Sequence, residues 1–120
     1  MVRKELLELA SKIEAASSLD LDLTAAVLRG LRVAFPTEAA AGHLPDGMSI
    51  SSDAIVDLVI SALPGWHFNI HGRARHSPAS WSCSLRRSDV LDDDEILGTG
   101  EARSLHQAIL AAVIRVAAWR

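Results

Sequence analysis

The 120-residue chain has few of the residues that usually reveal the chemistry of a small protein. Cys83 is its only cysteine, so neither an intrachain disulfide nor a zinc site built from several cysteines can form. It has no tyrosine, three tryptophans and two phenylalanines. Its core must be built mainly from alanine, leucine, valine and isoleucine, and we expect such a light core to be rich in helix.

The chain also lacks an excess of positive charge. Its formal net charge is −3, so we expect no general attraction to nucleic acid or to an anionic membrane. No segment approaches the ~20 consecutive apolar residues that a membrane span needs. The first residues alternate charge and leucine, whereas a signal peptide has an unbroken apolar run. We therefore expect a cytoplasmic protein.

Apolar periodicity predicts an N-terminal pair of helices. Over residues 3–16 apolar side chains recur at spacings of three and four, which is typical of an amphipathic helix. Asp20 is placed to cap a second helix, which must end before Pro36. The short polar link between the two indicates a helical hairpin over residues 1–35. Residues 35–49 contain two prolines and two glycines and predict a surface loop.

The rest of the chain predicts a helix, three strands and a last helix. A third helix, capped by Ser51 or Ser52, stops at the Pro-Gly pair 64–65. Trp66, Phe68 and Ile70 then alternate with polar residues, as in a half-buried strand, and residues 79–87 do the same. Pairing apolar with apolar places three pairs face to face: Trp66 with Leu85, Phe68 with Cys83, and Ile70 with Trp81.

A short third strand, weakened by glycines, and a helix over residues 104–119 complete the chain. This helix is apolar on two faces, and only Gln107, Ala111 and Arg115 indicate a water-facing stripe. We therefore expect it to pack between the sheet and either the N-terminal hairpin or another subunit, and we expect a homo-oligomer.

The predicted class is α+β. An N-terminal helical hairpin precedes an α-β-β-β-α unit with an antiparallel meander sheet packed by helices. We assign residues 1–120 to a single domain, with the hairpin over 1–35 and the α-β-β-β-α unit over 50–120.

Four stretches carry a resemblance to a known family. ELLELASKIEAA, LDLDLTAAV, AIVDLVISALPGWHFNI and the alanine-rich SLHQAILAAVIRVAAW together resemble the phage ABA-sandwich domain. That family consists of small phage and prophage proteins, largely without assigned function. The resemblance covers most of the chain. It implies a phage origin and a fold, and it supplies no catalytic residues.

Patterns typical of enzymes and metal sites are weak. His67 and His71 are four residues apart, which on a strand separates them by about 13 Å, too far for one metal ion. No GxSxG motif is present, although His71, Ser80 and a loop aspartate could be drawn as a triad. Cys83 is expected to face the core and stay protonated. The acidic run 89–95 lacks the ligand spacing of a calcium loop.

Nucleic-acid binding is also weakly indicated. The last five predicted elements have the order of a double-stranded-RNA-binding domain, but such domains need a lysine cluster at their last helix. The chain has only Lys4 and Lys12, both near its start.

The strongest candidate site is the polar face of the first two predicted strands. Its side chains are mostly hydrogen-bond donors suited to phosphates, hydroxyls and bases, and we expect the face to carry no carboxylate. A purely hydrated surface is the alternative. The candidate ligand-binding residues are His67, Asn69, His71, Arg73, Arg75, His76, Ser82, Ser84 and Arg86.

These features predict a small phage-encoded binding protein that is not an enzyme and needs no cofactor. It would act against host defence, by sequestering a nucleotide signal or by blocking a defence protein. A structural or assembly protein that oligomerises through its helices is one alternative, and a nucleotide hydrolase is another. The expected partners are an anionic small molecule, such as a nucleotide, and further copies of the chain.

Overall fold

The computed structural model describes residues 2–42, 51–73, 80–87 and 97–119. Within these residues it has the α+β architecture that the sequence predicts, with helices first, then a three-stranded antiparallel sheet, then a last helix. The elements are α1 (Arg3–Ala15), α2 (Leu21–Ala34), α3 (Pro36–Ala40), α4 (Ser52–Ala62), β1 (His67–Arg73), β2 (Ser80–Arg86), β3 (Leu97–Ala102) and α5 (Leu105–Ala118).

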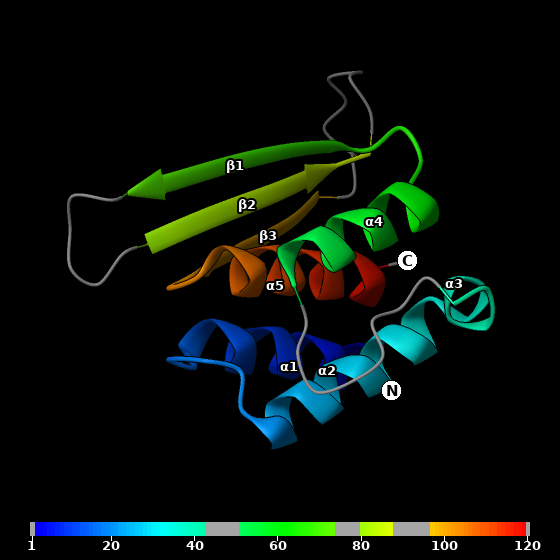
Figure 1. The fold of residues 1–120 in the computed structure, drawn as a ribbon, viewed down its shortest axis with the longest axis horizontal. Helices are drawn as coiled ribbons and strands as arrows, with labels where there is room; N and C mark the ends of the chain where they lie inside the picture. The colour runs from blue at the N-terminus through cyan, green and yellow to red at the C-terminus, as the bar shows by residue number, and fades with distance from the viewer. Residues whose placement is uncertain (1, 43–50, 74–79, 88–96, 120) are drawn as a thin grey trace.

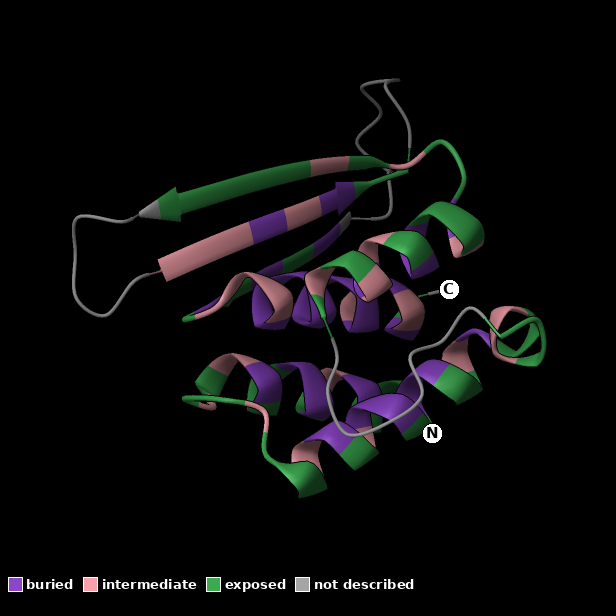
Figure 2. Ribbon diagram, viewed as in Figure 1, coloured by how far each residue is buried: buried purple, intermediate pink, exposed green. Residues whose placement is uncertain are grey.

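The last helix lies at the centre of a layered arrangement (Figure 1). The sheet is an outer layer, α5 runs directly beneath it, and α1 and α2 lie on the far side of α5. Almost the whole of α5 is buried, as Figure 2 shows. Its end is tied to the start of α1, because Arg3 Nε donates to the carbonyl oxygen of Ala118 at 2.8 Å.

Two predicted helix caps are present. The Asp20 carboxylate accepts a hydrogen bond from the backbone N–H of Leu23 at 2.7 Å, at the start of α2. The Ser51 hydroxyl accepts one from the N–H of Ala54 at 3.2 Å, at the start of α4. Each bond satisfies one of the N–H groups that the first turn of a helix leaves unpaired.

The prediction of a loop over residues 35–49 is wrong in its first part. Pro36 opens the short helix α3. Proline suits this position because its fixed φ is helical and the N–H that it lacks would have no partner there. Residues 43–49 of the predicted loop lie outside the described residues.

The predicted water-facing stripe of the last helix is wrong as well. Gln107 is buried, and its amide nitrogen donates to the carbonyl oxygens of Ile13 and Ala16, both at 2.9 Å. Ser104 donates to the Gln107 side-chain oxygen at 2.6 Å. The last carbonyl oxygens of a helix have no hydrogen-bond partner within it. Those at the end of α1 therefore accept from the Gln107 amide, and this buried side chain of α5 keeps its hydrogen bonds. This stripe therefore faces α1.

The second apolar face of α5 is thus covered by the chain's own N-terminal hairpin, which is one of the two arrangements predicted. The helix therefore gives no reason to expect an oligomer.

The predicted strand register is wrong by two residues. The observed pairs include Phe68 with Leu85, Ile70 with Cys83, and Gly72 with Trp81. An even shift keeps every side chain on its predicted face, so the apolar and polar sides are as expected. The shift places the Trp81 ring over Gly72, where an added Cβ would lie 2.8 Å from the ring. The indole of Trp81 fits in this place because Gly72, opposite it, has no side chain.

The two glycines of β3 bring the sheet against the backbone of α5. A Cβ added at Gly98 would lie 2.3 Å from the carbonyl oxygen of Ala112, and one at Gly100 would lie 2.1 Å from that of Ala108. Real Cβ atoms cannot come so close to backbone atoms. The glycines therefore weaken β3 as a strand but allow α5 to pack directly beneath it.

We predict that Gly100→Ala destabilises the protein by about 1–3 kcal/mol or more, because β3 must move away from α5 to make room for the methyl group. Thr99→Ala is the matched control, since the Thr99 side chain is exposed on the other face of the same strand. Urea unfolding measures both. Equal stability of the two variants would show that the close approach of β3 and α5 is not a constraint.

Candidate functional site

The outer face of the sheet is the side away from the helices. All described helices lie on one side of the sheet (Figure 1). Side chains alternate along a strand, so the residues between the core-facing ones all point to this outer face. Among the described residues nothing packs over it, and it is a surface that a ligand can reach.

Two rows of polar residues cross this face from strand to strand. In the first row His71 of β1 lies opposite Ser82 of β2, which lies opposite Glu101 of β3. The second row consists of Asn69, Ser84 and Thr99 in the same order. Neighbouring strands lie about 4.8 Å apart, so each row presents three polar groups within the width of a small molecule. We call these six residues the outer-face rows.

The outer-face rows line a hollow of about 410 Å³, together with Glu14 and Arg115. A second hollow of about 460 Å³ shares His71, Ser82 and Glu101 and adds Gly72 and Ser80. Both volumes fall within the range of small-molecule sites, which is roughly 300–1,000 Å³. The two hollows meet at the first row, so they form one open depression across the sheet.

An ion pair closes the edge of the sheet beside this depression. The Arg115 guanidinium binds both carboxylate oxygens of Glu14 and donates to the carbonyl oxygen of Thr99 at 2.7 Å. The backbone N–H of Glu101 donates to Glu14 at 2.8 Å. Helices α1 and α5 thus satisfy two of the backbone groups that β3 directs away from β2, and unsatisfied groups of this kind invite unwanted strand pairing.

The ion pair changes the acidity of both partners. Partial burial tends to raise the pKa of Glu14, but the hydrogen bonds from Arg115 and from the Glu101 N–H outweigh it and hold this pKa below its usual value. The hydrogen bond to Glu14 raises the pKa of Arg115. A carboxylate with a lowered pKa stabilises the fold above its unfolded-state pKa. That contribution is lost as the pH falls through the pKa of the folded state.

The structure brings together four of the nine predicted site residues, namely Asn69, His71, Ser82 and Ser84. His67 lies opposite Arg86 at the other end of the β1–β2 pair, and neither lines the depression. Arg73 ends β1 opposite Ser80. The remaining two predicted residues, Arg75 and His76, lie outside the described residues.

The expectation of a face without carboxylates is wrong. Glu101 lies on it and accepts a hydrogen bond from the Ser80 hydroxyl at 3.5 Å. The alternation of Thr99 and Glu101 with glycines could have placed both on the polar face of a third strand. Glu14 and Arg115 have no such local signal, because they lie 101 residues apart in the chain.

The outer-face rows do not form a nucleophilic triad. In a triad the histidine stands between the serine and the acid, whereas here Ser82 lies between His71 and Glu101. Within the described part of the chain His71 makes no hydrogen bond to Ser82. The predicted partner of His71 was Ser80, two residues away from the observed one. The loop aspartates of that possible triad lie outside the described residues.

The residues that the structure describes include neither a reactive thiol nor a group of metal ligands. Cys83 is buried, as predicted, and burial raises the pKa of its thiol to about 11. Across ranges 2–42, 51–73, 80–87 and 97–119, no three His, Cys, Asp or Glu side chains are grouped to hold a metal ion.

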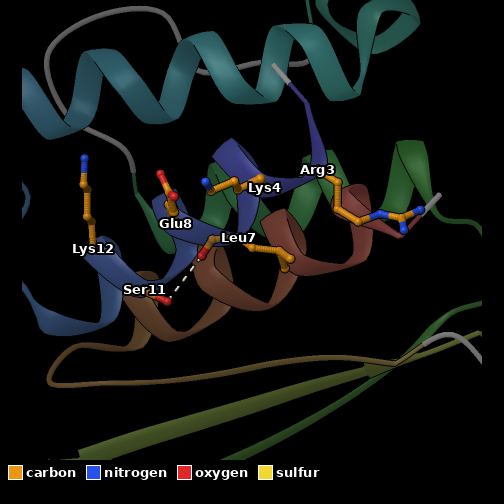
Figure 3. Close-up of a pocket in the computed structure, with 6 residues that line it drawn as sticks. All are labelled: Arg3, Lys4, Leu7, Glu8, Ser11 and Lys12. Carbon is orange, nitrogen blue, oxygen red and sulfur yellow. Dashed lines mark hydrogen bonds between the residues drawn. The ribbon is translucent and has the colours of Figure 1, made fainter.

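A larger hollow of about 680 Å³ lies along α1 (Figure 3). The Ser11 hydroxyl donates there to the backbone carbonyl oxygen of Leu7 at 3.3 Å. One helix supplies every wall of this groove, so few polar groups converge on any one point. The outer face, where side chains of three strands and two helices meet, is the better candidate site. The groove is lined by Arg3, Lys4, Leu7, Glu8, Ser11 and Lys12.

Comparison with known proteins found no family model, no curated protein and no solved structure that matches this chain. The resemblance to the phage ABA-sandwich domain therefore stays a prediction. Of the helices that the structure describes, none has the length and apolar character to cross a membrane.

We predict that Glu14→Gln lowers the stability of the protein at pH 7 by about 1.5–3 kcal/mol, the range for a hydrogen bond to a charged group. It should also reduce the loss of stability on acidification, because the carboxylate with the lowered pKa is gone. Glu8→Gln, an exposed site on the same helix, is the control. Urea unfolding at pH 7 and pH 3 measures both effects. A Glu14→Gln protein as stable and as acid-sensitive as the control would contradict the role of the ion pair.

Proposed function

We propose that this protein is a non-enzymatic binding protein that holds an anionic small molecule of the nucleotide class on the outer face of its sheet. The observation that carries the proposal is the depression lined by the outer-face rows. No described element covers it, and polar groups from three strands converge on it.

The chemistry of the depression matches the mixed character of a nucleotide. Asn69 and His71 on β1 offer hydrogen-bond donors, which a phosphate requires. Ser82 and Ser84 can donate or accept. Glu101 on β3 is an acceptor, suited to ribose hydroxyls or to the amino group of a base. We therefore place the phosphate toward β1 and the ribose or base toward β3, where the negative charge of Glu101 would repel a phosphate.

The biological setting of the proposal rests on the resemblance to phage proteins. In the cytoplasm of a host cell, a small phage protein with such a face would act by sequestering a nucleotide signal of host defence. Sequestration needs a site and no catalytic group. Blocking a defence protein directly is the other form of the same proposal.

The two alternatives have less support. The prediction of a structural protein that assembles through its helices rests on the two apolar faces of α5, and this helix is buried within the chain. A nucleotide hydrolase would need an activated nucleophile, and His71 makes no hydrogen bond to Ser82 in the described structure.

One experiment separates these functions. The protein is purified from cells with an active nucleotide-based defence, denatured, and the released small molecules are identified by mass spectrometry. An intact nucleotide in stoichiometric amount is the expected result. A cleaved nucleotide would favour the hydrolase, and release of no small molecule would contradict nucleotide sequestration.

We predict that His71→Ala and Ser82→Ala each weaken binding of the ribonucleoside monophosphate that binds best by about tenfold, the value of one hydrogen bond lost in a site. Ser17→Ala, in the exposed link between α1 and α2, should bind like the wild type. Isothermal titration with a panel of ribonucleoside monophosphates measures the affinities. Unchanged binding by both site variants would place any ligand elsewhere.

A further inference from the structure

The two edges of the sheet are treated differently by the fold. Glu14 and Arg115 cap the edge formed by β3. The strand order is β1-β2-β3, so β1 forms the other edge. In the part of the chain that the structure describes, no element pairs with that outer side of β1.

The backbone hydrogen bonds show which residues of β1 point outward. In an antiparallel ladder, both backbone groups of a residue point to the same neighbouring strand, and the direction alternates along the chain. The Thr99 carbonyl and the Glu101 N–H are bonded on the side away from β2. Their partners on β2, Ser84 and Ser82, therefore direct their backbone groups toward β1.

On β1 the partners of these serines are Asn69 and His71, so these two residues point toward β2. Alternation then directs the backbone groups of Phe68, Ile70 and Gly72 away from the sheet. They are a ready template for another strand.

The edge formed by β1 lacks several of the features that normally prevent strand pairing. Natural edge strands are protected by charged side chains, above all lysine, by proline, by a bulge or by being very short. Strand β1 contains neither lysine nor proline, and its register with β2 is continuous over all seven residues, so it has no bulge. At ~3.3 Å per residue, it offers an edge about 23 Å long.

We propose that β1 pairs antiparallel with β1 of a second copy of this chain, about a two-fold axis at Ile70. Ile70 is both the midpoint of His67–Arg73 and one of the residues that point outward. Full overlap of the two strands therefore pairs outward-facing residues only with one another: Ile70 with Ile70, and Phe68 with Gly72 of the second copy. Other partners could supply a strand, but the edge is complementary to itself.

The side chains on the helix side fit this pairing. Ile70 is 39% exposed, and it would be covered by its symmetry mate. Phe68 and Trp81 are only half-buried within one copy. Phe68 would lie opposite Gly72 of the second copy, beside the Trp81 ring that covers that glycine. The interface would bury three large apolar side chains from each copy.

On the outer face, Asn69 would lie opposite His71 of the second copy, and an amide and an imidazole can hydrogen-bond to each other. The two outer faces would join into one six-stranded surface. The pairing does not depend on a bound ligand.

The mass in solution tests the proposal. Light scattering of the ligand-free wild type should give twice the chain mass of 12.9 kDa. Ile70→Lys places like charges together at the axis and should give a single chain. Ile60→Lys is the matched control, since Ile60 is an exposed isoleucine on α4, and it should remain a dimer. A monomeric wild type at millimolar concentration, or an Ile70→Lys dimer, would overturn the proposal.

Charge pairing tests the register. A mixture of Ile70→Lys and Ile70→Glu should form a heterodimer, because opposite charges then meet at the axis, whereas each variant alone stays monomeric. Failure of the mixture to dimerise, with both variants folded by circular dichroism, would contradict a two-fold axis at Ile70.

Amide hydrogen exchange tests the same pairing on the wild-type protein, so the result does not depend on whether a variant folds. The N–H groups of Phe68, Ile70 and Gly72 should be protected, and their protection should increase with protein concentration. Rapid exchange of all three at every concentration would overturn the proposal.

Discussion

The contact between β3 and the backbone of α5 is the constraint on which the rest of the structure depends. Gly98 and Gly100 let the strand approach until any side chain would collide with the carbonyl oxygens of Ala112 and Ala108. The helix is rich in alanine for the same reason, since small residues on both sides allow close packing. This contact sets where the sheet lies relative to α5 and hence to α1, which packs on the other side of α5.

Because β3 lies so near α5, side chains from two helices can reach past it to its outer edge. Arg115 and Glu14 bind the backbone groups there, while Gln107 of α5 binds the last carbonyls of α1. The edge formed by β3 is thereby bound from within the chain, while no described element pairs with the edge formed by β1. The described helices all lie on one side of the sheet, and none of them covers the polar rows on the opposite face. The candidate site on the outer face and the difference between the two sheet edges thus both follow from the packing of β3 against α5.

Much of this fold can be predicted from local patterns. The spacing of apolar residues predicts α1, α2, α4 and α5, and Asp20 and Ser51 cap their helices as expected. The register could not be predicted in the same way, because a shift of two residues keeps every side chain on its face and still pairs Phe68 with Leu85 and Ile70 with Cys83. The contact that decides it is between the Trp81 ring and Gly72, and it depends on shape rather than on polarity.

The residues of the candidate site also differ in whether local patterns predict them. Alternation within β1 and β2 predicts the row positions of Asn69, His71, Ser82 and Ser84, and it could have predicted Thr99 and Glu101. Gln107 and Arg115 look water-facing from their own helix, because their partners lie at the far end of the chain. Polar residues on an apolar helix indicate solvent or a distant polar partner, and local sequence does not distinguish the two.

The central claim is that the outer face of the sheet is where a small anionic molecule binds. The most direct measurement is the change in backbone amide NMR shifts when ribonucleoside monophosphates are titrated into the protein. The account predicts saturable changes that cluster at the outer-face rows, from Asn69 and His71 across to Thr99 and Glu101. Changes confined to the α1 groove at Leu7 and Ser11, or no saturable change with any nucleotide, would contradict it.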